Sequence, residues 1–426
     1  MLIIVQQHGT VWRKLALVAA TLLLTACAGS RTVTYDTVEI VQAEADVPEH
    51  ALLDIGILIF DPGVSEDQQS TDDNLFPDVR RAEARYMPYH LKKTLESTGL
   101  WGSVWVLPER SDAIDLMVWG RIDHSDGLEV KLRIAAWDAT GKEWLNKVYK
   151  DRIPQKSYSK YRDLTVDPYQ DIYNEIANDL IALRDKLSEK ELKTVRQVAE
   201  LRFAADLVPS AFEAHLAEDD GEYTIRRLPA VDDPMVQRMR AVREREYIFI
   251  DTLNEYYASL YYEMSPAYED WRKMSREETL NYQELKRSAR MRQLLGFAAI
   301  LGAVAYEAQG GGNSAITNTA VLMGVQGLVS GFEKSAEAKE HSESLRELGE
   351  SFDSEAEPLV IELEGQTRRL TGTAEQKYLE WRRLLREIYS AETGFILADD
   401  SSESSTSQDS PTAGSAAENP APATVN

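Results

Sequence analysis

The chain has 426 residues, enough for about two or three domains. Hydrophobic residues make up 43% of it, which is sufficient to fill the core of a globular protein. The 47 Lys and Arg residues against 71 Asp and Glu residues give a formal net charge of −24. This balance argues against nucleic acid as a partner and against binding of lipid headgroups through a basic surface.

The chain begins with a pattern that is typical of a bacterial lipoprotein signal peptide. Arg13 and Lys14 supply positive charge, and the apolar run 15–24 that follows is too short to span a bilayer. Leu24-Thr25-Ala26-Cys27 then has the form of a lipobox, and Cys27 is the only cysteine. We predict a signal peptide over residues 1–26 and a lipid on Cys27; the alternative is a free cysteine beside an ordinary signal peptide.

Ala28, rather than Asp, follows the predicted lipid site. In sorted lipoproteins this implies the outer membrane, where several acyl chains hold a protein stably. With its cysteine acylated, the mature chain would have no disulfide. We therefore expect a protein on the periplasmic face of the outer membrane, attached by lipid.

A mixed α/β sandwich domain is predicted over residues 51–188, after a polar tether over 27–50. The apolar run 52–60 predicts a strand buried on both faces, and the stripe within 79–97 predicts a helix. Pro88 predicts a kink or a break in that helix. Further strands are expected at 104–107, 115–122, 128–137 and 142–149, and a further helix at 169–187.

This order of elements resembles a periplasmic domain of envelope proteins. The residues that carry the resemblance are Phe60-Asp61-Pro62, Pro108, Gly120 and Asp138-Ala139-Thr140-Gly141-Lys142. Over residues 52–187 the pattern is similar to the domain shared by the curli-secretion lipoprotein and the amino-terminal part of TolB. The penicillin-binding-protein activator lipoproteins have a similar domain. The whole layout resembles a family of uncharacterised proteobacterial outer-membrane lipoproteins, and the resemblance implies no functional residue.

A helical domain is predicted over residues 189–397, which makes the fold class α+β. Helices are expected at 191–207 and 209–216, before an acidic turn and a short strand at 223–226. Asp232-Asp233-Pro234 predicts the start of a long helix. That helix is expected to run to Met264, to restart at Ser265-Pro266 and to lead to Arg292.

An apolar stripe follows one face of this long helix and is rich in tyrosine. The helical spacing predicts a seam between helices, and stacking against glycan strands is the alternative. The stripe consists of Phe249, Leu253, Tyr256, Tyr257, Leu260 and Tyr261.

A Gly/Ala-rich helical hairpin is predicted over residues 293–332. Its segments 293–306 and 315–332 contain no charged residue, and a glycine turn at 310–313 separates them. We expect two helices that are buried in a bundle, or self-associating, or inserted in the membrane. The first segment is shorter than the roughly 20 residues that a membrane span needs, which favours burial or self-association. The residues expected to permit close helix packing are Gly296, Gly302, Gly324 and Gly327.

The carboxy-terminal part is predicted to end in a capped helix and a disordered tail. A short extended segment is expected at 358–361. Thr373 has the position of an N-cap, with Gln376 in capping-box spacing. From residue 398 to 426 the composition of Ser, Pro, Ala and acids is typical of disorder. The buried face of the helix is expected to comprise Tyr378, Trp381, Leu385 and Ile388.

The strongest candidate for a metal site is His215 with Glu218, Asp219 and Asp220, because imidazole and carboxylate oxygens lie close in sequence. A solvated acidic turn is the favoured interpretation. The sequence contains no nucleophile elbow, phosphate-binding loop or cysteine nucleophile. We therefore expect no catalytic residues, no metal and no cofactor.

The functional hypothesis that follows is a lipid-anchored periplasmic scaffold or accessory subunit of a cell-envelope assembly. Its partners would be the membrane, envelope proteins or further copies of the chain, with peptidoglycan contact as a minor alternative. The competing hypothesis is an oligomeric pore or secretion-channel component that uses the hairpin over residues 293–332.

Overall fold

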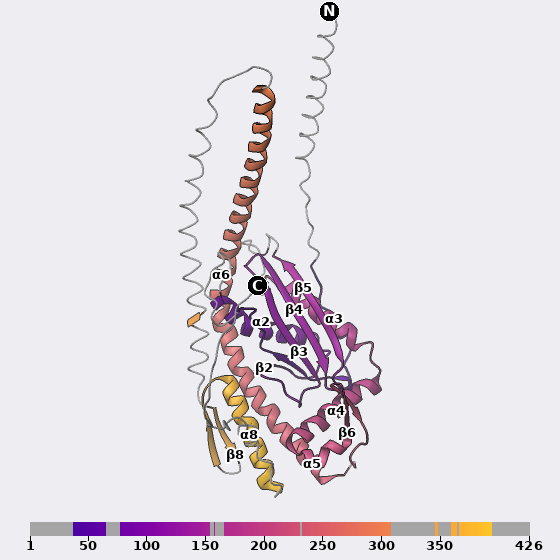
Figure 1. The fold of residues 1–426 in the computed structure, drawn as a ribbon. Helices are drawn as coiled ribbons and strands as arrows, with labels where there is room; N and C mark the ends of the chain where they lie inside the picture. Colours follow the sequence, from indigo (N-terminus) through magenta and orange to yellow (C-terminus); the bar gives the residue numbers. More distant parts are fainter. Residues whose placement is uncertain are drawn as a thin grey trace, which may run out of the picture.

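The computed structural model combines a mixed β-sheet with helices, so the chain has an α+β fold (Figure 1). The structure describes residues 37–64, 77–153, 157, 166–230, 232–307, 346–347, 359–363 and 366–393. The predicted signal peptide, Cys27, Gly324, Gly327 and the predicted tail lie outside the described residues, as does the entire second segment of the predicted hairpin, 315–332.

The main sheet has a parallel centre and an antiparallel extension. Strand β1 is parallel to both of its neighbours, β2 and β3, whereas β3, β4 and β5 pair antiparallel. Ile55 and Ile57 of β1 are fully buried, which accounts for the apolar run in the sequence. All the predicted strands of this region are confirmed. In spatial order the sheet comprises β2 (Val104–Leu107), β1 (Ile55–Leu58), β3 (Leu116–Ser125), β4 (Glu129–Asp138) and β5 (Glu143–Arg152).

Helix α2 (Pro77–Ser97) passes through Pro88 without a break, so the predicted break is wrong. Proline has no N–H to donate to the carbonyl of residue 84, which would leave a buried acceptor unpaired. In the structure the backbone N–H of Phe60 donates to the Ala84 carbonyl at 2.9 Å. The chain at the end of β1 therefore supplies the hydrogen bond that the proline removes.

The predicted tether is bound to the protein from residue 38 onward. It lies along α3 (Gln170–Arg184), where Asp171 accepts a hydrogen bond from the Val38 N–H at 3.0 Å. Asn178 accepts from the Val41 N–H at 2.9 Å and donates to the Glu39 carbonyl at 2.8 Å. The chain then enters a short helix, η1 (Glu49–Ala51). Only residues 27–36 are left to act as a tether.

Helix α4 (Glu189–Leu207) begins with a capping box formed by Ser188 and Glu191. In place of the single helix predicted at 209–216, the structure has two shorter helices. These are α5 (Pro209–Phe212) and η3 (Glu213–His215), which ends there because Leu216 already belongs to a strand. That strand, β6 (Leu216–Asp219), forms a hairpin with β7 (Glu222–Ile225). The turn between them places Asp220 and Gly221 at φ 51 and φ 81, which suits these residue types.

Helix α6 (Pro234–Glu307) is continuous over 74 residues. Its start is as predicted, with Asp233 accepting a hydrogen bond from the Met235 N–H at 2.8 Å. The predicted restart at residue 265 is wrong, and the segment 293–307 continues the same helix. Pro266 frees only the carbonyl of Tyr262, a residue that is 58% exposed, so water can satisfy that carbonyl.

Helix α6 covers the edge of the sheet at β2. The side-chain amide of Asn254 donates to the Val106 carbonyl at 3.0 Å, and its oxygen accepts from the Val106 N–H at 2.8 Å. The indole of Trp105 donates to Asp251 at 2.6 Å. Asn254 thereby occupies backbone groups that an edge strand otherwise leaves open to another chain.

The carboxy-terminal elements are the hairpin of β8 (Leu359–Leu363) and β9 (Gln366–Leu370) and the helix α8 (Ala374–Thr393). The predicted capping box is confirmed, because Thr373 accepts from the Gln376 N–H at 3.3 Å and Gln376 accepts from the Thr373 N–H at 3.0 Å. The predicted apolar face of α8 is buried.

One hydrophobic cluster extends from Leu53 in the amino-terminal region to Tyr389 in α8. The boundary that we predicted between residues 188 and 189 therefore crosses a shared core. Independent folding of residues 51–188 stays a prediction.

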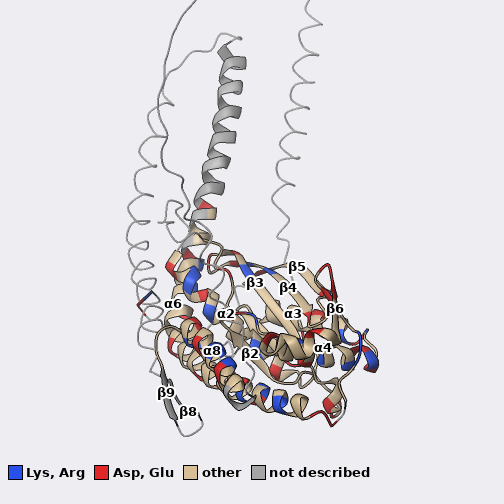
Figure 2. Cartoon of the chain, turned by 60° about the horizontal axis from the view of Figure 1, so that its bottom comes forward, with Lys and Arg blue, Asp and Glu red and all other residues tan. Residues whose placement is uncertain are grey.

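Charged residues of both signs are interspersed along the helices of the body (Figure 2). Among the residues that the structure describes, no helix is long and apolar enough to cross a membrane.

Candidate functional site

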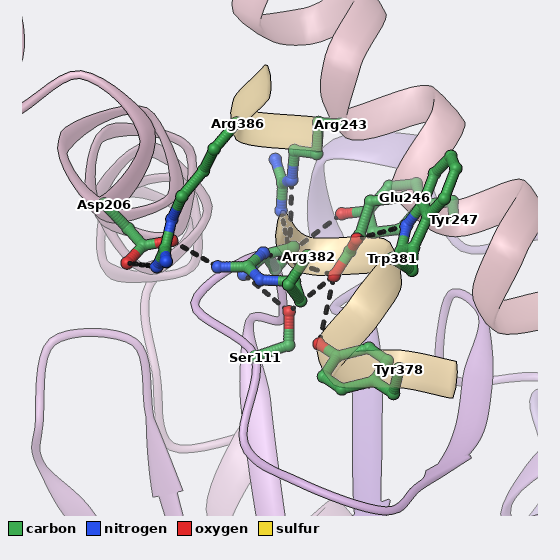
Figure 3. Close-up of polar contacts among 10 residues, drawn as sticks. Ser111, Asp206, Arg243, Glu246, Tyr247, Tyr378, Trp381, Arg382 and Arg386 are labelled. Atoms are coloured by element: carbon green, nitrogen blue, oxygen red, sulfur yellow. Dashed lines mark hydrogen bonds and ion pairs between the residues drawn. The ribbon is translucent and has the colours of Figure 1, made fainter. Parts of the chain in front are cut away.

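A buried carboxylate on α6 organises the contact with α8, and Figure 3 shows this arrangement. Glu246 is fully buried and accepts hydrogen bonds from the Trp381 indole at 2.8 Å and the Tyr378 hydroxyl at 3.0 Å. Arg382 donates at 3.2 Å, and Ser111 donates at 3.4 Å from the β2–β3 connection. We call Glu246, these donors and Asp206 the α8 junction. Donors from two directions surround the carboxylate, which holds α8 on α6.

Arg382 extends the α8 junction to α4. Its guanidinium pairs with Asp206 as well as with Glu246, and Arg386 pairs with the other oxygen of Asp206 at 3.2 Å. Tyr247, the residue after Glu246 on α6, donates to the Ala113 carbonyl at 2.9 Å. The junction therefore joins α4, α6, α8 and the connection between β2 and β3.

A second buried cluster, the α2 junction, lies farther along α6 and comprises Glu83, Arg80, Ser125, Tyr268, Asp167 and Arg272. Glu83 is fully buried and accepts hydrogen bonds from Ser125 and, at 2.7 Å, from the Tyr268 hydroxyl. Burial raises the pKa of Glu83, and Arg80, 3.9 Å away, opposes that change. The carboxyl group thus ties α2 to both β3 and α6.

Asp167 and Arg272 form the ion pair of the α2 junction. One guanidinium nitrogen of Arg272 lies 2.8 and 2.9 Å from the two oxygens of Asp167, and the side chains are 3% and 5% exposed. Burial acts to raise the pKa of Asp167, but the Arg272 guanidinium, together with the hydrogen bond from the Tyr169 N–H, outweighs it and holds that pKa at about 2. The pair fixes the chain before α3 to the middle of α6.

His90 lies beside the α2 junction in its neutral form, because burial lowers its pKa. Its Nε2 lies 2.8 Å from the Gln170 oxygen, and its Nδ1 lies 2.8 Å from the Tyr261 hydroxyl. The amide of Gln170 donates to Asn174 at 2.9 Å, which orients its oxygen toward the histidine. His90 therefore donates to Gln170 and accepts from Tyr261, and both nitrogens are used.

The tyrosine-rich stripe of α6 forms a seam between helices, as favoured from its spacing. The rings of Tyr86 and Tyr261 stack with centroids 4.5 Å apart, and Tyr89 lies 5.0 Å from Tyr261. Tyr257 and Tyr261 are 1% and 7% exposed. Glycan stacking requires open ring faces, and these rings are covered by protein.

A further buried carboxylate lies just before β3. Asp115 is fully buried and accepts a hydrogen bond from the Asp54 N–H at 3.0 Å. Arg243 and Arg196 lie 3.6 and 3.8 Å from its oxygens. Burial raises the pKa of Asp115 to about 6, although Arg243 opposes the change.

A small pocket of about 180 Å³ lies between α4 and α6. Its polar rim includes Glu200 and Arg240, which pair with each other. None of the buried carboxylates described above lines it. Its walls comprise Gln197, Leu201, Ala204, Phe212, Leu228, Pro229, Ala230, Val236 and Met239. The pocket is therefore separate from the buried acids. The acids form hydrogen bonds and ion pairs with side chains of neighbouring elements.

The candidate metal residues lie on the β6–β7 hairpin and just before it. His215 Nδ1 is 2.9 Å from the Arg227 carbonyl, so the ring is engaged with backbone. Glu218, Asp219 and Asp220 are exposed along the hairpin. Among the residues that the structure describes, no three His, Cys, Asp or Glu side chains are grouped to hold a metal ion.

Of the predicted packing glycines, Gly296 and Gly302 lie on the last turns of α6. Gly324, Gly327 and the lipid site Cys27 lie outside the described residues, so their roles stay predictions.

The buried acids were not predicted, although the sequence contains a signal for them. Glu246 lies at helical spacing between Val242 and Phe249, inside the apolar stripe. Glu83 lies in the same way between Val79 and Tyr86. An acid within an apolar stripe indicates a buried carboxylate that has partners.

In comparison with known proteins, no family model, no curated protein and no solved structure matches the chain.

Proposed function

We propose that the protein is a lipid-anchored scaffold or accessory subunit of a periplasmic envelope assembly. The observation that supports it most is α6, whose 74 residues correspond to about 110 Å of helix. The α8 and α2 junctions fix its first part in the body, and its second part projects from the body (Figure 1). A helix held in this way fixes the distance between the body and a partner that binds at the projecting end of the helix.

The attachment of the amino-terminal segment also supports this proposal. Because residues 38–41 are bound to α3, about ten residues separate Cys27 from the body, which allows at most about 36 Å of reach. A lipid on Cys27 would therefore hold the body close to the membrane surface. Partners that assemble there would meet the protein in a restricted range of positions.

The outer surface of the antiparallel strands is the proposed surface for partner proteins. Arg121 and Arg133 are 46% and 44% exposed on β3 and β4, and Val148 on β5 is 38% exposed. An apolar side chain among arginines is a common composition of protein interfaces.

Metabolic labelling with a fatty-acid analogue tests the anchor. We expect label on the wild type and none on Cys27→Ser; equal labelling would contradict the proposal. A photo-crosslinking amino acid at position 148 tests partner binding in the intact envelope, with position 190 on α4 as the exposed control. Protein adducts that form from position 148 and not from position 190 are expected.

The pore hypothesis is separated from this proposal by the mass of the protein in detergent. A monomer, or a complex with other proteins, agrees with a scaffold, whereas a closed ring of identical chains would favour the pore.

A further inference from the structure

The projecting end of α6 has a charge pattern opposite to that of the whole chain. Residues 285–292 contain Lys286, Arg287, Arg290 and Arg292 and no acid, in a chain with a formal net charge of −24. Residues 293–306, which follow directly on the same helix, contain no charge at all. The net charge of the chain therefore conceals a basic segment that is joined to an apolar one.

This segment lies beyond the described contacts that hold α6 in the body. Ser275 and Thr279 donate to the Asp126 carbonyl at the β3–β4 turn. The last described contact with the sheet joins Arg152 to Gln283 at 3.3 Å. From there to Glu307 the helix continues for about 36 Å, and Figure 1 shows it leaving the body.

The described chain begins at the same end of the body. Val38 is bound to Asp171 at the start of α3, and the chain just before α3 is held to α6 by the Asp167–Arg272 pair. In Figure 1 the first described segment, drawn in indigo, joins the body beside β5 and α3, on the side toward which α6 projects. The reach of residues 27–36 and the length of the projecting helix are both about 36 Å. A lipid at Cys27 and the end of α6 can therefore reach one plane.

We propose that residues 285–307 of α6 form a second membrane contact, which binds the surface of a bilayer that contains anionic phospholipid. The inference rests on the proposed lipid anchor, which would place the membrane on the side toward which α6 projects. The cations of 285–292 would pair with phosphate headgroups, and the apolar residues of 293–306 would enter the boundary between headgroups and acyl chains. This uncharged segment is about 21 Å long as a helix, short of the roughly 30 Å hydrocarbon core, so the contact lies at the surface and does not span.

Flotation with vesicles tests the contact without the lipid anchor. The chain from residue 28 to 426 contains every described residue and lacks both the apolar leader and Cys27. We expect it to float with vesicles of phosphatidylethanolamine and phosphatidylglycerol, and to float poorly with phosphatidylcholine alone. Added salt should weaken the binding, because it screens exposed charges.

A matched pair of variants separates the segment from net charge. Neutralising Lys286, Arg287, Arg290 and Arg292 to Gln should weaken binding to anionic vesicles by about three orders of magnitude. The control changes the same residue types, each exposed on α4, on the connection from β7 to α6, or at the start of α6: Lys190, Arg226, Arg227 and Arg238 to Gln. It should bind as the wild type does. Equal loss of binding in both variants, or no flotation of the unmodified chain, would overturn the proposal. An acidic protein would then be the expected partner of residues 285–307.

A site-specific probe reports where the contact forms. Without Cys27 the chain has no cysteine, so Ala299→Cys takes a single environment-sensitive fluorophore. Its emission should shift to shorter wavelength with anionic vesicles, whereas the same label at Ser210→Cys on α5 should not respond. A response at position 210 and none at 299 would contradict the assignment. Since these chains lack Cys27, failure here leaves the acylation result unaffected.

Discussion

The two parts of α6 use charged residues in different ways. Between Pro234 and Gln283, Glu246 and Arg272 are buried and bind partners on α8 and before α3. Between residues 285 and 306 the charges gather in one basic segment, 285–292, and are absent from 293–306. Both parts are helical, so the difference does not come from helix propensity. It shows that neighbouring elements decide whether a charge on a helix stabilises the fold or remains for binding.

Removing the arginine of the α2 junction should have the largest effect on stability. Arg272→Leu leaves Asp167 buried without its ion-pair partner, which should lower the free energy of unfolding by about 4 kcal/mol. The matched change Arg290→Leu, in the projecting part of the same helix, should alter it by about 0.5 kcal/mol or less. Urea unfolding followed by circular dichroism measures both. Equal shifts in the two variants would remove the distinction between the two parts of α6.

The buried carboxyl of Asp115 should make stability depend on pH. Its folded pKa of about 6 lies above the unfolded value of about 3.9, so the folded state binds more protons between these values. The contribution of Asp115 to the free energy of unfolding should therefore fall by about 3 kcal/mol as pH rises from about 4 to about 6. Asp167 has the opposite sign, but its contribution is lost only as pH falls below about 4.

The control for this pH dependence is Asp115→Asn, which keeps an acceptor for the Asp54 N–H. Its unfolding free energy should change less than that of the wild type across the same range. An unchanged pH profile in the variant would assign the dependence to another group.

The α8 junction should respond to loss of a single acceptor. Glu246→Gln places an amide NH₂ where a carboxylate oxygen now accepts hydrogen bonds, so a buried donor faces another donor. We expect a loss of about 2 kcal/mol. Glu244→Gln, at an exposed position two residues earlier on the opposite face of α6, should have almost no effect. Thermal melts of both proteins distinguish a buried role from a general effect of removing a negative charge.

The smallest effect is expected in the projecting part of α6. Gly302→Ala should favour the local helix by up to about 1 kcal/mol, since alanine is the better helix former. The urea midpoint of the body should not move, because the position lies beyond the described contacts with it. Amide hydrogen exchange should slow only around residue 302. A shift of the global midpoint would mean that this end of α6 contributes to the core.

Local patterns in the sequence were sufficient to predict most elements. The strands of the main sheet alternate or are continuously apolar, and turns such as Asp138-Ala139-Thr140-Gly141 separate them. The start of α6 at Pro234 and the capping box of Thr373 and Gln376 were also predictable. These features depend on residues within a few positions of one another, so the sequence contains all the information that they need.

The tertiary structure alone decided where these elements continue and what they bind. Pro88 does not break α2, because the N–H of Phe60 takes up the carbonyl that the proline frees. Glu246 becomes the centre of a junction only because α8, 132 to 136 positions away, brings its donors there. An interaction between groups so distant in sequence has no local signature beyond an acid in an apolar stripe. Its partners are known only once the chain has folded, because folding alone brings them within hydrogen-bond distance.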